Sequence, residues 1–151
     1  MSDAPSHTSH LLVRAGGYVC ALPLGAVRRV VRSLVVHPLL GGAPELKGLA
    51  EFAGEPLPVL DLARLVGGTA EAAGAAHAGA PVTIVAWAGP AESREMVGLS
   101  VDAALEVVEV PPETVVGGVG GAGGLVAGEA AVHGQVVRVL DLAALGAGVA
   151  R

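Results

Sequence analysis

The sequence is poor in the residues that supply disulfides and stacking surfaces. Cys20 is the one cysteine, so an internal disulfide is impossible, and this suits a reducing compartment. The aromatic side chains are Tyr18, Phe52 and Trp87, which offer few platforms for nucleic-acid bases. Acidic residues outnumber basic ones by 14 to 9, giving a net charge of −5. A protein of this composition lacks the broad basic surface that nucleic-acid binding requires.

The sequence also lacks a recognisable targeting or membrane-spanning segment. The first ten residues are polar, without the basic and apolar regions of a secretory signal. Residues 72–91 carry no formal charge and are nearly long enough to span a bilayer. They are rich in alanine and glycine, however, and contain Pro81 and Pro90. We therefore expect a loop followed by a buried strand, in a cytoplasmic protein with no direct membrane insertion.

Short apolar segments separated by glycine and proline dominate the rest of the chain. Segments of this length and spacing are typical of small β-barrels or sandwiches. Only residues 61–66 and 141–146 have a helical pattern, and each is short. The sequence predicts an all-β fold with strands in residues 10–15, 18–22, 26–36, 46–54, 56–60, 81–87, 96–101, 103–110, 125–134 and 135–140.

An internal repeat organises these segments. Residues 48–66 align without a gap to residues 128–146, and both copies contain V-L-D-L-A. Residues 21–30 align more weakly to residues 98–107. We therefore predict one domain over residues 10–145, preceded by a flexible tail of residues 1–9. Within this domain we expect two tandem five-stranded units, residues 10–66 and 80–146. They would pack together, because neither is large enough to be stable by itself.

Each repeat places one aspartate, Asp61 or Asp141, where a strand ends and a short helix is expected. Aspartate is a preferred N-cap, because its carboxylate accepts hydrogen bonds from the first helical amides. A catalytic pair of aspartates is the alternative. An aspartic protease requires a small hydroxyl residue and glycine after each aspartate, whereas leucine and alanine follow here. We favour structural caps and keep a two-aspartate enzyme as a remote alternative.

No other motif predicts catalysis, a metal or a cofactor. The five histidines show no ligand spacing. Gly118, Gly120 and Gly123 form a G-x-G-x-x-G pattern, but the strand-like sequence after it does not open a helix as a dinucleotide site requires. Cys20 lies in an apolar segment, where an inert buried thiol is expected. We therefore expect a protein that is not an enzyme.

Four motifs together resemble the CheW family of bacterial chemotaxis coupling proteins. They are "ALPLGAV" from residue 21, the "GEPLPVLDL" segment ending at residue 62, "GLSVDAALEVVEV" from residue 98 and "VVRVLDLAAL" ending at residue 145. The resemblance implies two five-stranded SH3-like β-barrels around a shared apolar layer, with short helices after each V-L-D-L motif. It also implies a non-enzymatic adaptor in chemoreceptor arrays. The implied partners are chemoreceptor cytoplasmic tips, which lay a helix between the barrels, the regulatory domain of a CheA-type histidine kinase, and other CheW-like proteins.

The resemblance also implies which residues form the interaction surface. Its groove positions are apolar residues at the front of each half, and a plain core role is the alternative for each. Gly54 matches the glycine of the family's usual Arg-Gly pair. The groove positions in this sequence are Val27, Val30, Val101, Ala104 and Val107.

Two positions depart from the family pattern. Arg29 stands where the family usually has glutamate, and Ala53 stands where it usually has arginine. In the family these two side chains lie near each other and near the partner surfaces. The changes favour, as an alternative, a divergent adaptor that binds the receptor or array and has lost kinase binding.

Arg28, Arg29 and Arg32 form a basic cluster in an otherwise acidic protein. The cluster is either a solvated strand face or a site for an acidic partner surface. In the second case it would act mainly on association rate and partner choice.

Overall fold

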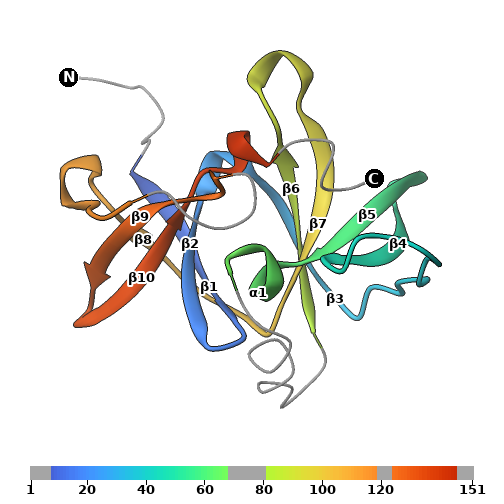
Figure 1. Cartoon of the computed structure of the whole chain (residues 1–151), viewed down its shortest axis with the longest axis horizontal. Coiled ribbons are helices and arrows are strands. Elements are labelled where there is room, and N and C mark those ends of the chain that lie inside the picture. Colours follow the sequence, from blue (N-terminus) through green and yellow to red (C-terminus); the bar gives the residue numbers. More distant parts are fainter. Residues whose placement is uncertain (1–7, 68–80, 119–123, 146–151) are drawn as a thin grey trace.

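The structure, a computed structural model, describes residues 8–67, 81–118 and 124–145. In this part of the chain ten strands form two five-stranded sheets that lie side by side (Figure 1). One sheet, in the order β8-β1-β2-β10-β9, is called the β1 barrel below, and the other, β3-β6-β7-β5-β4, the β3 barrel. The strands are β1 (Ser9–Ala15), β2 (Tyr18–Pro23), β3 (Val27–Arg32), β4 (Leu46–Phe52), β5 (Glu55–Asp61), β6 (Val82–Ala88), β7 (Glu95–Val101), β8 (Ala103–Glu109), β9 (Val126–Val132) and β10 (Gln135–Leu140).

The predicted all-β class and the two five-stranded units are confirmed, but the units are not the two halves of the chain. Each barrel combines two leading strands of one half with three closing strands of the other. The exchange occurs because the chain crosses between barrels at the 3₁₀ helix Leu24–Ala26 and again at Asp102. The boundaries 10–66 and 80–146 for the two barrels are therefore wrong. Parallel pairing of β2 with β10 and of β5 with β7 joins the halves.

The internal repeat is still evident in the strand orders of the two barrels. Replacing β1 to β5 by β6 to β10, and the reverse, converts the strand order of one barrel into that of the other. Two expected boundaries also move. Ser9 already belongs to β1, and β3 ends at Arg32 because Ser33 adopts a left-handed backbone with φ +60°. Residues 1–7 of the expected tail, residues 68–80 around the boundary between the two expected units, and residue 146 at the end of the second unit lie outside the described residues.

Three apolar clusters fill the molecule. The first lies between the barrels and draws on both sheets, including Leu22 of β2 and Leu99 of β7. The second fills the β1 barrel and the third fills the β3 barrel, each with contributions from all five strands of its sheet. A barrel interior on each side of a shared apolar layer is the arrangement that the resemblance implies.

Two glycines of the repeat allow each barrel to close. In the β3 barrel, His37 pairs with Leu49 of β4 through two backbone hydrogen bonds of 2.8 and 2.9 Å. A Cβ atom on Gly48 would lie 2.1 Å from the His37 carbonyl oxygen. Gly128 approaches the backbone of Val116 in the same way in the β1 barrel. The repeated glycine is thus explained by close backbone approach.

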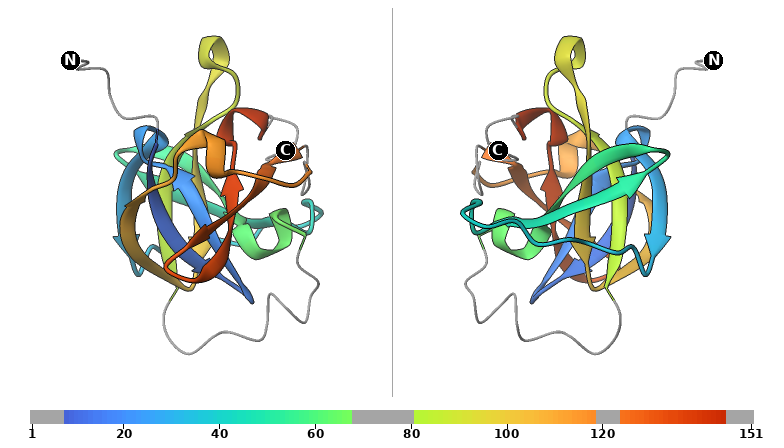
Figure 2. Two further views of the ribbon diagram at one scale, coloured as in Figure 1. Left: turned by 90° about the vertical axis from the view of Figure 1, so that its left-hand side faces the viewer. Right: turned by 90° about the vertical axis from the view of Figure 1, so that its right-hand side faces the viewer.

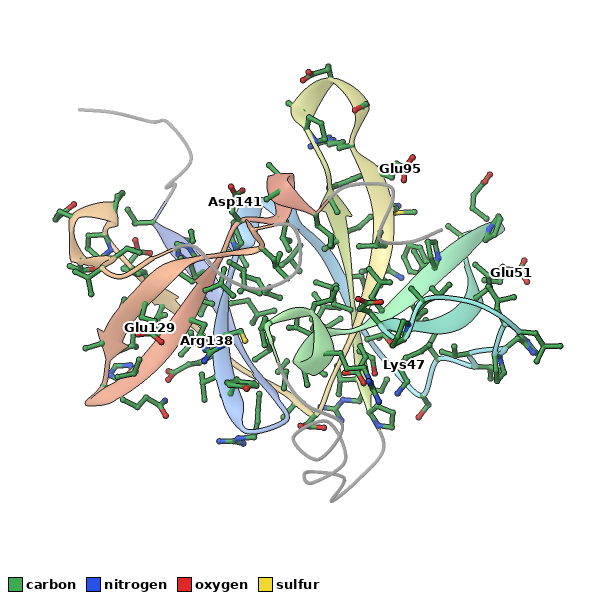
Figure 3. All side chains as sticks on the ribbon, in the orientation of Figure 1. Lys47, Glu51, Glu95, Glu129, Arg138 and Asp141 are labelled. Carbon is green, nitrogen blue, oxygen red and sulfur yellow. The ribbon has the colours of Figure 1, made fainter. Side chains whose placement is uncertain are left out.

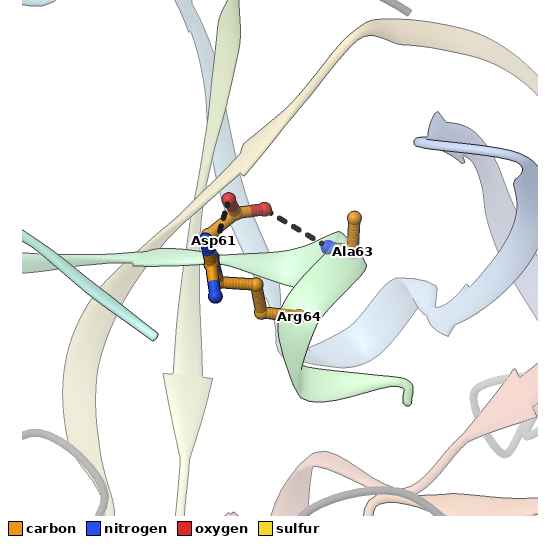
Figure 4. A network of polar contacts seen from close by, with 3 residues as sticks. All are labelled: Asp61, Ala63 and Arg64. Atoms are coloured by element: carbon orange, nitrogen blue, oxygen red, sulfur yellow. Dashed lines mark hydrogen bonds and ion pairs between the residues drawn. The ribbon is translucent and has the colours of Figure 1, made fainter. Parts of the chain in front are cut away.

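Both V-L-D-L motifs lead into a single helical turn. α1 (Leu62–Leu65) follows Asp61, and a 3₁₀ helix (Leu142–Ala144) follows Asp141. The Asp61 carboxylate accepts a hydrogen bond of 3.2 Å from the Ala63 amide and lies 3.8 Å from Arg64 Nε (Figure 4). Asp141 makes the equivalent bond of 3.1 Å. These are the contacts that the N-cap interpretation predicts.

Candidate functional site on strands β3 and β8

The expected interaction surface lies on β3 and β8, which are equivalent strands of the repeat. Each is an end strand in the order of its sheet: β3 pairs with β6, and β8 pairs with β1. Figures 1 and 2 show β3 and β8 on the same side of the molecule, running in opposite directions. The two-fold relation between the barrels thus passes between these strands.

The predicted apolar positions divide into exposed and packed residues. Val30 on β3 is 42% exposed and Val107 on β8 is 53% exposed. Val27 and Ala104 are partly buried and pack against the core shared by the barrels. Val101, at the end of β7, is 3% exposed and belongs to that core. The burial of Val101 therefore fits the alternative of a plain core role better than it fits a position on the interaction surface.

The two departures from the family pattern lie together at one end of the β3 barrel. The guanidinium carbons of Arg28 and Arg29 lie 5.6 and 5.7 Å from the centroid of the Phe52 ring, within the range of cation–π attraction. Phe52 ends β4, and the exposed pair Ala53-Gly54 then turns the chain into β5. Both turn residues have positive φ, +53° and +80°, as a type I′ hairpin turn requires.

The β1 barrel has an acid–base pair at the equivalent place. Glu106 on β8 corresponds to Arg29, and His133 in the β9–β10 turn corresponds to Ala53. The His133 ring lies 3.6 Å from the Glu106 carboxylate. The φ values of His133 and Gly134, +50° and +79°, match those of the other turn. Sequence reasoning missed Phe52, Glu106 and His133, although the repeat alignment itself supplies the signal for the last two.

Two larger hollows lie next to this region. One, of about 780 Å³, adjoins the end of β3 and is lined mainly by apolar side chains, among them Val31, Leu34 and Leu39. Another, of about 440 Å³, contains Asp141 and Trp87, whose ring lies 4.7 Å from the Arg94 guanidinium carbon. Asp61 lines a different, much smaller cavity. The two aspartates therefore do not share a site.

Arg138 of β10 connects the barrels on the opposite side from the end strands. It donates a hydrogen bond of 2.7 Å to the Val66 carbonyl, just after α1, and its guanidinium stacks 4.2 Å from the Tyr18 ring. Figure 3 shows it on β10 beside Glu129 of β9. Burial raises the pKa of the nearby Cys20 thiol to about 12, and the positive charge of Arg138 opposes this rise. Cys20 therefore has none of the thiolate character of a nucleophile.

Among residues 8–67, 81–118 and 124–145, no group of three or more histidine, cysteine, aspartate or glutamate side chains is placed to hold a metal ion. Within the same ranges, every helix is too short or too polar to cross a membrane.

Comparison with known proteins identifies the family. The model of the CheW-like domain matches residues 9–148, so the chain belongs to the CheW-like domain family. Among solved structures, the chain is similar to the scaffolding protein TtCheW from Thermoanaerobacter tengcongensis. The two share 17% sequence identity, with a TM-score of 0.69 over 89% of each chain, a likeness that shows the fold. A search of curated proteins found no match.

Proposed function

We propose that this protein is a non-enzymatic cytoplasmic adaptor of a chemosensory array. It would bind the cytoplasmic tip of a chemoreceptor through β3 and β8 and connect it to the regulatory domain of a CheA-type histidine kinase. The observation that carries the receptor part is the placement of Val30 and Val107. These exposed apolar side chains occupy equivalent positions on two end strands on one side of the molecule. Such a surface suits an amphipathic helix.

The receptor part is tested by substitutions at this surface. Val30→Asp and Val107→Asp each place a charge where the apolar face of a partner helix would lie. We expect either variant to weaken binding of a purified receptor tip at least tenfold, measured by titration calorimetry. Val136→Asp is the matched control, because Val136 is 64% exposed but lies on β10. Equal binding by all three variants and the parent would refute this surface.

A second candidate, an adaptor that has lost kinase binding, is favoured by Arg29 and Ala53. Both departures lie next to Phe52, at the place where the family usually has an acid–base pair. A receptor-tip and kinase-domain pull-down separates the candidates. Binding to the receptor tip alone, with kinase binding restored by Arg29→Glu combined with Ala53→Arg, supports the divergent adaptor. Strong binding of the parent protein to both partners contradicts it, and binding to neither contradicts the adaptor function.

A further inference from the structure

Two neighbouring arginines of β3 contact the same aromatic ring. Consecutive side chains of a regular strand point to opposite faces of its sheet. The shift in register between Val27 and Arg29 makes Arg28 an extra residue on β3, and a bulge of this kind redirects side chains. The guanidinium carbons of Arg28 and Arg29 consequently lie 5.6 and 5.7 Å from the centroid of the Phe52 ring. The bulge thus brings two positive charges together at one end of the β3 barrel.

These two guanidiniums have no carboxylate partner within the described part of the chain. Neither side chain forms an ion pair or a hydrogen bond with another described residue. Glu51 precedes Phe52 and Glu55 pairs with it across the hairpin, and both glutamates are exposed. Contact with the ring leaves the N–H donors of each guanidinium available for hydrogen bonds. The arginine pair can therefore bind carboxylates of another molecule.

An apolar groove begins beside the same hairpin. The hollow of about 780 Å³ is lined by Gly54, two residues after Phe52, and by the segment that follows β3. Val35 and Leu39 of that segment are exposed apolar side chains, and Arg32 also lines the hollow. Exposed apolar side chains gathered in one place are typical of an interaction surface. The groove and the arginine pair are together called the arginine groove.

We propose that the arginine groove binds an acidic segment of a partner protein. Apolar side chains of the segment would enter the hollow, and its carboxylates would pair with Arg28, Arg29 and Arg32. Charge complementarity carries this choice of partner, because three exposed arginines stand on one short strand of a protein whose net charge is −5. The overall negative charge disfavours a nucleic acid. A peptide can place side chains in a hollow, whereas a lipid surface cannot fill it.

This site goes beyond the proposed receptor binding. The receptor surface is centred on Val30 and Val107, whereas the arginine groove belongs to the β3 barrel alone. An adaptor with both sites could hold a receptor helix and an acidic partner at the same time.

The test uses fluorescein-labelled peptides of about 12 residues and the full chain. The acidic peptide has leucine at three alternate central positions and a pair of glutamates on each side. A neutral peptide has glutamine in place of each glutamate, and a polar peptide has serine in place of each leucine. Fluorescence anisotropy measures their binding at low salt and in 0.5 M NaCl.

We expect the acidic peptide to bind roughly tenfold more tightly than the neutral peptide, because each exposed ion pair contributes up to about fivefold. Arg28→Gln combined with Arg29→Gln should remove most of this difference, and so should 0.5 M NaCl, which screens exposed charges. Arg14→Gln is the matched control, because Arg14 is an exposed arginine on β1 of the other barrel. Leu39→Ser should weaken the acidic and neutral peptides alike, and the polar peptide should bind least.

Amide chemical shifts of ¹⁵N-labelled protein locate the bound peptide. The amides of Leu39, Leu49 and Gly54, which line the groove, should shift on addition of the acidic peptide. Shifts confined to Val107 and its neighbours on β8 would place the peptide on the proposed receptor surface and overturn the arginine groove.

The remaining outcomes are equally decisive. Equal binding of the acidic and neutral peptides, or binding of neither, overturns the acidic partner. Co-sedimentation with phosphatidylglycerol vesicles in place of peptide binding identifies a membrane surface as the occupant and also overturns it. Failure of the receptor tip to bind, with tight and salt-sensitive binding of the acidic peptide retained, refutes the receptor surface and supports this inference.

Discussion

The closing strand pair of the β3 barrel should depend on the absence of a side chain at Gly48. In Gly48→Ala the new Cβ atom would lie 2.1 Å from the His37 carbonyl oxygen, far inside contact distance, and the obstacle is backbone. The segment carrying His37 must move away, and both hydrogen bonds to Leu49 are lost. At about 0.5–1.5 kcal/mol each, these bonds contribute about 2 kcal/mol to the free energy of unfolding.

Thermal and urea unfolding measure this change. A loss of about 2 kcal/mol lowers the Tm of a chain of this size by about 4–8 °C. Gly25→Ala is the matched control, because Gly25 is exposed with no atom within 4 Å of its added Cβ, and its effect should stay within about 0.5 kcal/mol. Hydrogen exchange should also show faster exchange of the Leu49 amide in Gly48→Ala. If Gly48→Ala is as stable as Gly25→Ala, the account of barrel closure is wrong.

Four further predictions concern three side chains, Asp61, Cys20 and Arg138. Asp61→Ala should lower the free energy of unfolding by about 1 kcal/mol in urea titrations, because it removes the N-cap of α1, whereas Asp61→Asn should have little effect. The Cys20 thiol should react with a thiol reagent at pH 8 only when the protein opens, so its labelling rate should rise with urea. Because burial raises the pKa of Cys20 from 9.0 to about 12, its contribution to stability is full below pH 9 and is lost as the pH rises toward 12; Cys20→Ala should flatten the stability profile over that range. Arg138→Met should lower the Tm and speed exchange in α1, because the hydrogen bond to the Val66 carbonyl is lost.

Much of the fold could be predicted because its signals are local. Each signal depends on a few neighbouring residues: the strand patterns, the turn residues and the aspartates after V-L. The structure has strands and short helices at those places. The exchange of strands between barrels has no such signal. The exchange depends on which sheet edge β3 and β8 join after the chain crosses between barrels. The parallel pairing of β2 with β10 and of β5 with β7 decides this choice, and the paired strands are far apart in sequence.

The candidate site was predictable to a lesser degree. Alternation along a strand predicts that neighbours face opposite sides, but the shift in register between Val27 and Arg29 interrupts this alternation on β3. Val101 was expected at the surface, yet it lies in the shared core because β7 is a central strand. The left-handed backbone of Ala53 also had no signal, since alanine seldom adopts it, although the equivalent His133 does the same.

The two departures from the family pattern are physically coupled through Phe52. Arg29 lies where its positive charge meets the negative face of the Phe52 ring, which is a favourable contact. A glutamate at this place would meet the same face with a negative charge, so it requires a nearby base, as Glu106 has in His133. An arginine at position 53 would supply that base for a glutamate but would repel Arg29. Arg29 with Ala53, and glutamate with arginine, are thus the two consistent combinations. A change at one position alone should therefore cost more stability than the double change, a coupling that a double-mutant cycle measures directly.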